Sequence, residues 1–539
     1  MKKWFSGIRP SWYLLALIIA LLAIGIRLNA GQRIIDDSYI TYRYAKNILA
    51  GNGFVFNPGE HVLGTTTPLY TLLLVIVALP FGGANANFPL LSYTLNAFID
   101  GAICLVLYQF GRRMDHSLLG IASALAISLA PYSVTFSIGG LETSLYVFLL
   151  IGIAYTYIQE RFEWTALLAA LAFLTRPDAM ILIVPIIIDY ILIILSQIHK
   201  TSKPTRNISL QRFLRVGLIF TLPCTLWLLF AHSYFGSFFP NSIAAKALAY
   251  HLPQHSALIR LLQHYATPFA EDKTFGKWGI AAGLILYPSL ALFGGMEFLR
   301  KTKRMLAFTL FPWIYFLVFA LANPLIFRWY LTPPLPFYIL CIFMGTIALW
   351  RRIAQAIQSK VTQLRINCSA IQICSTIILP TLLILPAWQL HPTHGPDRLA
   401  PEMAYIQLEL HYNEAVNFLE AYSPKPLSSL TIAAGDVGVL GYRTNAYILD
   451  TVGLNSPQTL DYFPIEPQYY VINYAIPTQL ILDNLPDYVV MLEVYGRKTL
   501  LTSKDFLMRY RLVNKIDTDI YGSDGLLIFK KESVYSSHH

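Results

Sequence analysis

Charged residues are scarce in this chain. Of its 539 residues only 13% are Asp, Glu, Lys or Arg, whereas 55% are hydrophobic. A soluble protein carries about a quarter charged residues, so this composition excludes a water-soluble globular fold over the whole length. The deficit indicates many membrane spans, and hence a lipid bilayer as surroundings, rather than a single anchor.

Acidic residues are rarest before residue 391. Residues 391–539 hold 11 Lys and Arg against 17 Asp and Glu, and the first 390 residues hold 29 basic and 13 acidic ones. The basic residues cluster in short connections between apolar runs, as the positive-inside rule requires. The net charge of +10 therefore belongs to the membrane part and does not indicate a nucleic-acid partner.

Several functional signatures are missing. The five cysteines lie in or beside apolar segments and form no spaced disulfide or metal framework. No HExxH motif appears, and there is no Walker loop, so a nucleotide-driven pump is disfavoured. We expect no cofactor and name no metal ligand, although the sequence does not settle metal dependence.

Long apolar runs dominate what is present. Several are shorter than the roughly 20 residues of a full span, so the helices should extend into the flanks. The runs cover residues 12–26, 88–110, 118–131, 145–158, 164–174, 179–195, 216–231, 278–293, 305–321, 335–350 and 371–388, and a shorter twelfth run covers 69–79.

The charge pattern orients these runs. All the basic connections lie in the cytoplasm at once if residues 29–87 form one outer loop and the run at 69–79 dips into the bilayer without crossing. This predicts eleven crossings in the cell (inner or plasma) membrane, with a cytoplasmic N-terminus. The outer segments are then 29–87, 132–144, 175–178, 232–277, 322–334 and 391–539, and they hold the unusual polar motifs.

The tail differs from the rest of the chain. An amphipathic helix is predicted at 403–419, and short strands at 430–434, 446–449, 488–492 and 526–529. About 150 residues suffice for one α/β domain. The sequence thus predicts a polytopic α-helical membrane domain over 1–390 and an extracytoplasmic (periplasmic) α/β domain over 391–539.

An acidic pair, Asp36-Asp37, follows the first apolar run at the outer mouth of the membrane. Carboxylates at a bilayer edge are costly and so mark a functional site. Asp37 could cap the amphipathic helix that begins near Ser38, which explains one carboxylate but not two. The functional reading is a general base whose proton affinity is raised by an apolar wall.

The pair opens a series of motifs that resembles the GT-C glycosyltransferases. The likeness is greatest to the terminal arabinofuranosyltransferase-like branch, and more distant to protein O-mannosyltransferases and lipid A aminoarabinose transferases. Each motif is weak alone, but the series runs in order through most of the chain. The motifs occupy 36–47 (Asp-Asp-Ser-Tyr-Ile-Thr-Tyr-Arg-Tyr-Ala-Lys-Asn), 51–60, 63–69, 140–144, 174–178, 235–246, 435–438 and 450–455.

The resemblance implies a glycosyltransferase that takes a sugar from a polyprenyl-phosphate donor. The sugar, arabinofuranose or another pentose or hexose, would pass to a cell-envelope glycan or lipid acceptor on the outer face. The catalytic carboxylate of the family lies in the first outer loop and corresponds here to Asp36 or Asp37. We favour Asp36 as the base, because Asp37 has the competing capping role.

A departing phosphate needs cations as its charge develops. The outer motifs offer four candidates, of which Lys246 ranks first and Arg328 second, ahead of Arg176 and Arg43. Arg43 and Arg328 could instead be interfacial residues beside aromatic rings, and Arg176 could pair with Asp178.

Four more residues are candidates for substrate binding: Glu142, Asp178, Asn241 and Tyr44. Glu142 could instead favour a helix N-terminus electrostatically. In the tail, Asp436 and Asp450 could face the acceptor or serve as turn residues. Two carboxylates interrupt apolar runs: a structural pairing is expected for Asp189, and Asp100 stays open.

The alternative function is a transporter or flippase of lipid-linked sugars, a class that builds its site at the bilayer midplane. A third reading is a membrane-tethered binding module.

Overall fold

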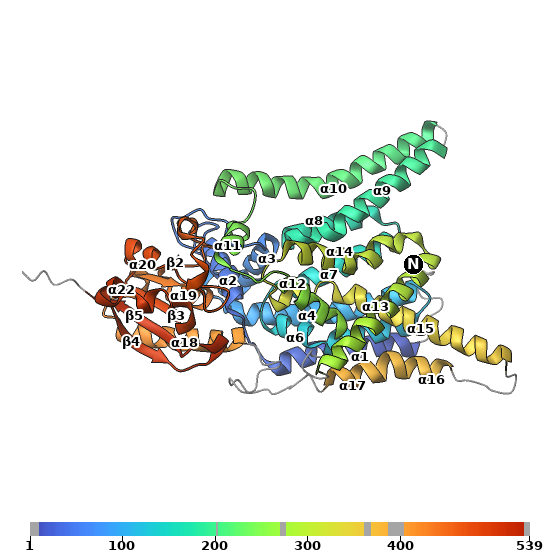
Figure 1. Ribbon diagram of the computed structural model, residues 1–539. Coiled ribbons are helices and arrows are strands. Elements are labelled where there is room, and N and C mark those ends of the chain that lie inside the picture. Colours follow the sequence, from blue (N-terminus) through green and yellow to red (C-terminus); the bar gives the residue numbers. More distant parts are fainter. Residues whose placement is uncertain (1–9, 201–202, 270–275, 361–367, 386–403, 533–539) are drawn as a thin grey trace, which may run out of the picture.

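The computed structural model describes residues 10–200, 203–269, 276–360, 368–385 and 404–532. Apolar helices form a bundle, and a small sheet domain lies at one end of it (Figure 1). The predicted boundary between the two domains at residue 390 lies outside the described residues.

Every apolar run predicted from the sequence is helical within the described residues. The helices of the bundle are α1 (Pro10–Ala30), α4 (Phe88–Arg113), α5 (Ser117–Leu129), α6 (Pro131–Ile138), α7 (Thr143–Ile158), α8 (Phe162–Thr175), α9 (Met180–Lys200), α10 (Lys203–Phe235), α13 (Gly276–Lys301), α14 (Leu306–Ala322), α15 (Leu335–Lys360), α16 (Cys368–Ile373) and α17 (Leu379–Ile384), the last two joined by a π-helical turn over Cys374–Ile378.

Seven described helices are long and apolar enough to cross a membrane. An eighth candidate span is broken, because α5 and α6 meet at 54° where Pro131 begins α6. Four shorter apolar helices lie at 68–81, 143–158, 162–175 and 368–384. The protein is therefore a polytopic helical membrane protein, and the total of eleven crossings stays a prediction.

Two of the basic connections between apolar runs are largely helical within the described residues. Helix α9 continues to Lys200, α10 begins at Lys203, and α15 continues to Lys360. Lys and Arg are good helix formers, so the charge marks where a membrane boundary falls without ending the helix. Parts of α9 and α10 run away from the rest of the bundle (Figure 1).

Two intramembrane carboxylates have structural partners. Asp100 in α4 pairs with the Arg27 guanidinium of α1, which also donates to the backbone carbonyl of Ser128 and to the Ser133 hydroxyl. Asp189 accepts a hydrogen bond from the hydroxyl of Tyr157. These partners satisfy both carboxylates within the helix bundle, as buried charge requires.

The outer loops contribute four short helices at the junction with the sheet domain. They are α2 (Asp36–Leu49), α3 (Pro68–Ala78), α11 (Asn241–Ala249) and α12 (Ser256–Ala266). The predicted amphipathic helix after the acidic pair is α2. Its side chains pack into the junction, and most of them are buried.

The C-terminal domain is a five-stranded mixed sheet with helices. The strands β1 (Thr431–Ala434), β2 (Tyr447–Asp450) and β3 (Tyr488–Leu492) are parallel, and β4 (Tyr510–Ile516) and β5 (Leu526–Lys531) complete the order β2-β1-β3-β5-β4. The helices are α18 (Ala404–Tyr422), α19 (Gly438–Thr444), α20 (Thr478–Asn484), α21 (Glu493–Gly496) and α22 (Lys504–Arg509).

Strand β4 was not among the strands predicted from the sequence. It lies at the sheet edge, buries only its end residues Tyr510 and Ile516, and carries an irregularity between Leu512 and Asn514. Charged, bulged edges protect a sheet from further pairing, and they also remove the apolar alternation by which strands are recognised.

The sheet domain and the first outer loop share one hydrophobic core. Tyr42 and Tyr44 of α2 pack in the same cluster as Ile432 of β1 and Val489 of β3. Helix α19 lies directly against α2, because a Cβ atom on Gly438 would come within 1.8 Å of the Asp36 carbonyl oxygen. The tail is thus docked on the loop that carries the acidic pair.

Candidate active site

A polar cavity of about 350 Å³ lies where the outer motifs converge. Its walls come from the first outer loop, the start of α7, the connection between α8 and α9, helix α11 and the segment after α14. The polar residues that line it are Asp37, Thr41, Thr65, Thr66, Thr67, Glu142, Arg176, Asp178, Ser242, Lys246, Trp329 and Tyr330. Motifs hundreds of residues apart in the sequence therefore meet in one site.

Asp37 is the carboxylate of the acidic pair that faces this cavity. The position before α2 is Ile35, and no side chain there caps the helix, so the expected capping by Asp37 does not occur. Burial raises the pKa of Asp37, and the attraction of Lys246 partly lowers it again. A carboxylate with raised proton affinity beside a cavity can act as a general base.

Asp36 has a different environment. It is 4% exposed, and its two oxygens accept hydrogen bonds from the backbone N–H groups of Gly438 and Val439, at 2.9 and 2.8 Å. Burial raises its pKa, and Asp436 raises it further. Asp36 thereby joins α2 to the first turn of α19 and does not line the cavity, which counts against the expectation that it is the base.

Lys246 brings a cation to the cavity from α11. Burial lowers its pKa, but attraction to Tyr330 and Asp37 outweighs this, and the pKa lies above its ordinary value. Its ammonium nitrogen lies 4.8 Å from the centre of the Phe327 ring. Lys246 therefore keeps its charge at neutral pH.

Ser242 lies one helical turn before Lys246 and lines the same cavity. It is buried, and its hydroxyl has no hydrogen-bond partner among the described residues. A buried polar atom without a partner is uncommon, and a hydroxyl of this kind beside a cavity is available to bind a substrate. The i, i+4 spacing to Lys246 was the signal that could have identified Ser242 from the sequence.

Arg176 is held between two carboxylates. Its guanidinium contacts Asp178 at 2.9 Å and Glu142 at 3.2 Å. Burial lowers the pKa of Arg176, but these two carboxylates raise it well above its ordinary value. The expected pairing with Asp178 is present, and Glu142 joins it, so the three residues form a charged cluster on one wall.

Three threonines at 65–67 also line the cavity and were not singled out as site residues. They follow Gly64, where an added Cβ atom would lie 2.1 Å from the side-chain oxygen of Asn455. The run of three hydroxyls in the 63–69 motif was the signal for them. Hydroxyls in this position can donate to sugar or phosphate oxygens.

Besides Asp36, three further predicted site residues lie outside this cavity and make contacts within the protein. Arg43 is 2% exposed, donates to Asn57 and to the Ala446 carbonyl, and stacks on Phe56, so it braces α2 against the sheet domain. The hydroxyl of Tyr44 donates to the carbonyl of Val62, and Asn241 donates to the carbonyl of Gly453. All three make polar contacts within the protein, although one guanidinium nitrogen of Arg43 has no hydrogen-bond partner among the described residues.

Arg328 lines a second polar cavity of about 280 Å³. Its neighbours there include Asp436 and Tyr250. The structure therefore separates Arg328 from Lys246 and Arg176, with which it had been grouped as a donor-phosphate cation.

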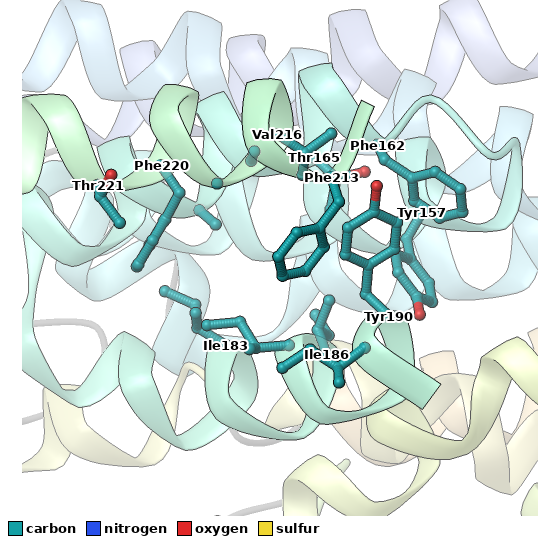
Figure 2. A pocket seen from close by; sticks show the side chains of 15 residues that line it. Tyr157, Phe162, Thr165, Ile183, Ile186, Tyr190, Phe213, Val216, Phe220 and Thr221 are labelled. Carbon is teal, nitrogen blue, oxygen red and sulfur yellow. The ribbon is translucent and has the colours of Figure 1, made fainter. Parts of the chain in front are cut away.

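A third cavity, of about 230 Å³, is apolar and lies between α8, α9 and α10. Figure 2 shows the rings of Phe213 and Tyr190 beside it, with Ile183 and Ile186 on the opposite wall. Its lining contains no Asp, Glu, His, Lys or Arg. It suits hydrocarbon and cannot supply the chemistry of the polar cavity.

Comparison with solved structures identifies the fold. The archaeal oligosaccharyltransferase AglB from Archaeoglobus fulgidus, solved with an inhibitory peptide and a dolichol-phosphate, matches at TM-score 0.53 and 13% identity, over 92% of this chain and 72% of that one. ArnT from Cupriavidus metallidurans, solved with undecaprenyl phosphate, matches at TM-score 0.53 and 13% identity, over 98% and 99% of the two chains.

Sequence comparison gives shorter matches. A terminal beta-(1->2)-arabinofuranosyltransferase of Mycobacterium tuberculosis is 32% identical over 117 residues, which span 21% of this chain and 19% of that protein. Residues 401–532 match a family described as a domain of unknown function (DUF8728). The structural neighbours and this curated relative are GT-C glycosyltransferases. The predicted fold is confirmed: the chain has the GT-C fold, with a small sheet domain at its C-terminal end.

Proposed function

We propose that this protein is an integral-membrane inverting glycosyltransferase. It would move a sugar from a polyprenyl-phosphate donor to a cell-envelope glycan or lipid on the outer face. The observation that carries the proposal is that Asp37 and Lys246, from distant segments, open on one cavity and attract each other. A proton acceptor opposite a cation is the minimum that transfer from a lipid phosphate needs.

The proposed step is a single displacement with Asp37 as the base. The acceptor hydroxyl gives its proton to the Asp37 carboxylate while its oxygen bonds to the anomeric carbon of the donor. The bond from that carbon to the phosphate oxygen breaks, and its electron pair leaves with polyprenyl phosphate. Lys246 stabilises the charge that develops on this phosphate, since a fixed cation costs no reorganisation during the reaction.

Other residues of the cavity would bind the sugar and the phosphate of the donor. Arg176 is neutralised by Glu142 and Asp178, so this cluster offers carboxylate oxygens to sugar hydroxyls more readily than a free cation to phosphate. The Ser242 hydroxyl would donate to the donor phosphate beside Lys246. The curated relative transfers arabinofuranose, which makes a pentofuranose the first sugar to test.

The test is transfer in proteoliposomes. Purified protein receives undecaprenyl-phosphate-linked arabinofuranose, mannose or glucose together with a panel of glycan and glycolipid acceptors, and mass spectrometry detects the glycoside and the released undecaprenyl phosphate. The proposal predicts both products in equal amounts, formed about 10²-fold more slowly in Lys246→Gln. Movement of the lipid-linked sugar across the vesicle without a glycoside would identify a flippase instead.

A further inference from the structure

The second polar cavity lies at the carboxyl ends of the three parallel strands. Gly435 and Asp436 follow β1, Val452 follows β2, and Tyr495 follows β3, and all four line it. The opposite wall comes from the membrane part and includes Tyr250. Open α/β sheets bind ligands in the crevice outside the carboxyl ends of their strands, so this is where the domain would hold one.

The two polar cavities adjoin each other. Residues 325–328 line the second cavity, while Pro324, Trp329 and Tyr330 of the same segment line the first. In the loop after β2, Val452 faces the second cavity and Leu454 the first. A molecule in the second cavity therefore sits next to the one that holds the reacting groups.

Asp37 lies close to this shared boundary. Burial, together with the nearby charge of Asp37, raises the pKa of Asp436 to about 7. Burial and the same charge also raise the pKa of Tyr250. Asp37 also follows Asp36 directly in the chain, and the two Asp36 oxygens accept hydrogen bonds from the N–H groups of Gly438 and Val439, which come just after Asp436. A group that projects from the second cavity toward the first would meet Asp37.

The lining of the second cavity suits a carbohydrate. Tyr250, Tyr474, Tyr495 and Tyr521 supply apolar ring faces with polar tips, the combination that binds a molecule with one apolar face and many hydroxyls. Asp436 is fixed by a hydrogen bond from the hydroxyl of Tyr412 at 3.1 Å. Its carboxyl group can accept from a sugar hydroxyl, and Arg260 and Arg328 line the same space.

We infer that this second cavity is a carbohydrate subsite that holds the acceptor glycan and presents its hydroxyl to Asp37. The inference rests on the proposed function for its direction of transfer, but the binding of sugar in this cavity is a separate claim. Asp436 and Tyr521 would be its specificity-determining contacts, one polar and one aromatic.

The test measures sugar and lipid binding side by side in nanodiscs. Saturation-transfer NMR uses the methyl glycosides of arabinofuranose, galactofuranose, mannose and glucose, and undecaprenyl phosphate is titrated separately. The substitutions are Asp436→Asn and Tyr521→Ala, the latter at a side chain that is 46% exposed, where truncation is compatible with folding. Lys246→Gln is the matched substitution in the first cavity.

The inference predicts that at least one glycoside binds the wild type and that both second-cavity variants weaken it at least tenfold, with undecaprenyl phosphate binding unchanged. Lys246→Gln should weaken the binding of undecaprenyl phosphate and leave the binding of the glycoside unchanged. If no glycoside of the panel binds, or if binding is the same in Asp436→Asn and Tyr521→Ala, the subsite is refuted. Undecaprenyl phosphate binding that Lys246→Gln leaves intact would instead count against the proposed function.

Discussion

The two neighbouring aspartates show how burial and contact divide roles at the residue scale. Sequence spacing placed both at the outer mouth of the membrane and could not separate them. The separation depends on residues 438 and 439, about 400 positions away, whose N–H groups bind Asp36. Asp37 is left beside the cavity. Partners this distant in sequence leave no local pattern, so only the tertiary structure distinguishes the two.

The same dependence on distant contacts explains why only two of the four predicted cations line the first cavity. Lys246 and Arg176 were recognised from their motifs, and both line the cavity. Arg43 and Arg328 stand in equally suggestive sequence, but one braces the sheet domain and the other lines the second cavity. An arginine beside aromatic residues is typical of both a phosphate site and a structural contact.

Lys246 gives a prediction about pH. Because Lys246 lowers the pKa of Asp37, Lys246→Met should raise it further. The base must be ionised, so transfer falls as pH drops through this pKa, and the acid limb of the profile should move to higher pH by about one unit. The measurement is kcat/KM against pH in proteoliposomes, with Lys246→Arg, which keeps the charge, as the control. An acid limb at the same pH in both would contradict the coupling.

At the scale of elements, hydrophobic periodicity predicted most of the helices and strands. The long apolar runs became helices, and four of the five strands were anticipated, because buried elements carry a strong apolar signal. The bend at Pro131 and the edge strand β4 were not, since a break within an apolar run and a charged sheet edge both weaken that signal.

The contact between α2 and α19 gives a prediction about stability. Gly438→Ala should destabilise the protein by about 1–3 kcal/mol, because its Cβ atom would lie 1.8 Å from the Asp36 carbonyl oxygen and the helices must separate. Thermal unfolding in detergent measures this. Gly25→Ala in α1 is the matched control, since its added Cβ atom meets nothing within 4 Å. Equal melting temperatures for the two variants would refute the close approach.

At the scale of the whole molecule, the sheet domain and the outer motifs lie at one end of the bundle (Figure 1). The positive-inside pattern predicts that the sheet-domain end is extracytoplasmic. The polar cavity would then open on the face where a lipid-linked sugar meets its acceptor. The sequence predicts this orientation because the Lys and Arg residues of each connection can be counted without knowing how the helices pack.

Labelling of single cysteines tests the orientation. In a cysteine-free background, Ser237→Cys and Lys425→Cys should react with a membrane-impermeant maleimide in intact spheroplasts, since both positions are exposed and lie on the predicted outer side. Lys303→Cys, exposed on the predicted inner side, should react only after permeabilisation. Labelling of Lys303→Cys but not Lys425→Cys in intact cells would invert the topology.

The most direct test of the account compares the two aspartates in the proteoliposome transfer assay. Asp37→Asn should lower the transfer rate about 10²–10⁴-fold with an unchanged melting temperature, because it removes the base alone. Asp36→Asn should lower the melting temperature, since the amide NH2 group that replaces one carboxylate oxygen cannot accept an N–H hydrogen bond, while transfer at low temperature persists. Full transfer by Asp37→Asn, or its abolition by Asp36→Asn in a fully stable protein, would contradict the assignment of Asp37 as the catalytic base.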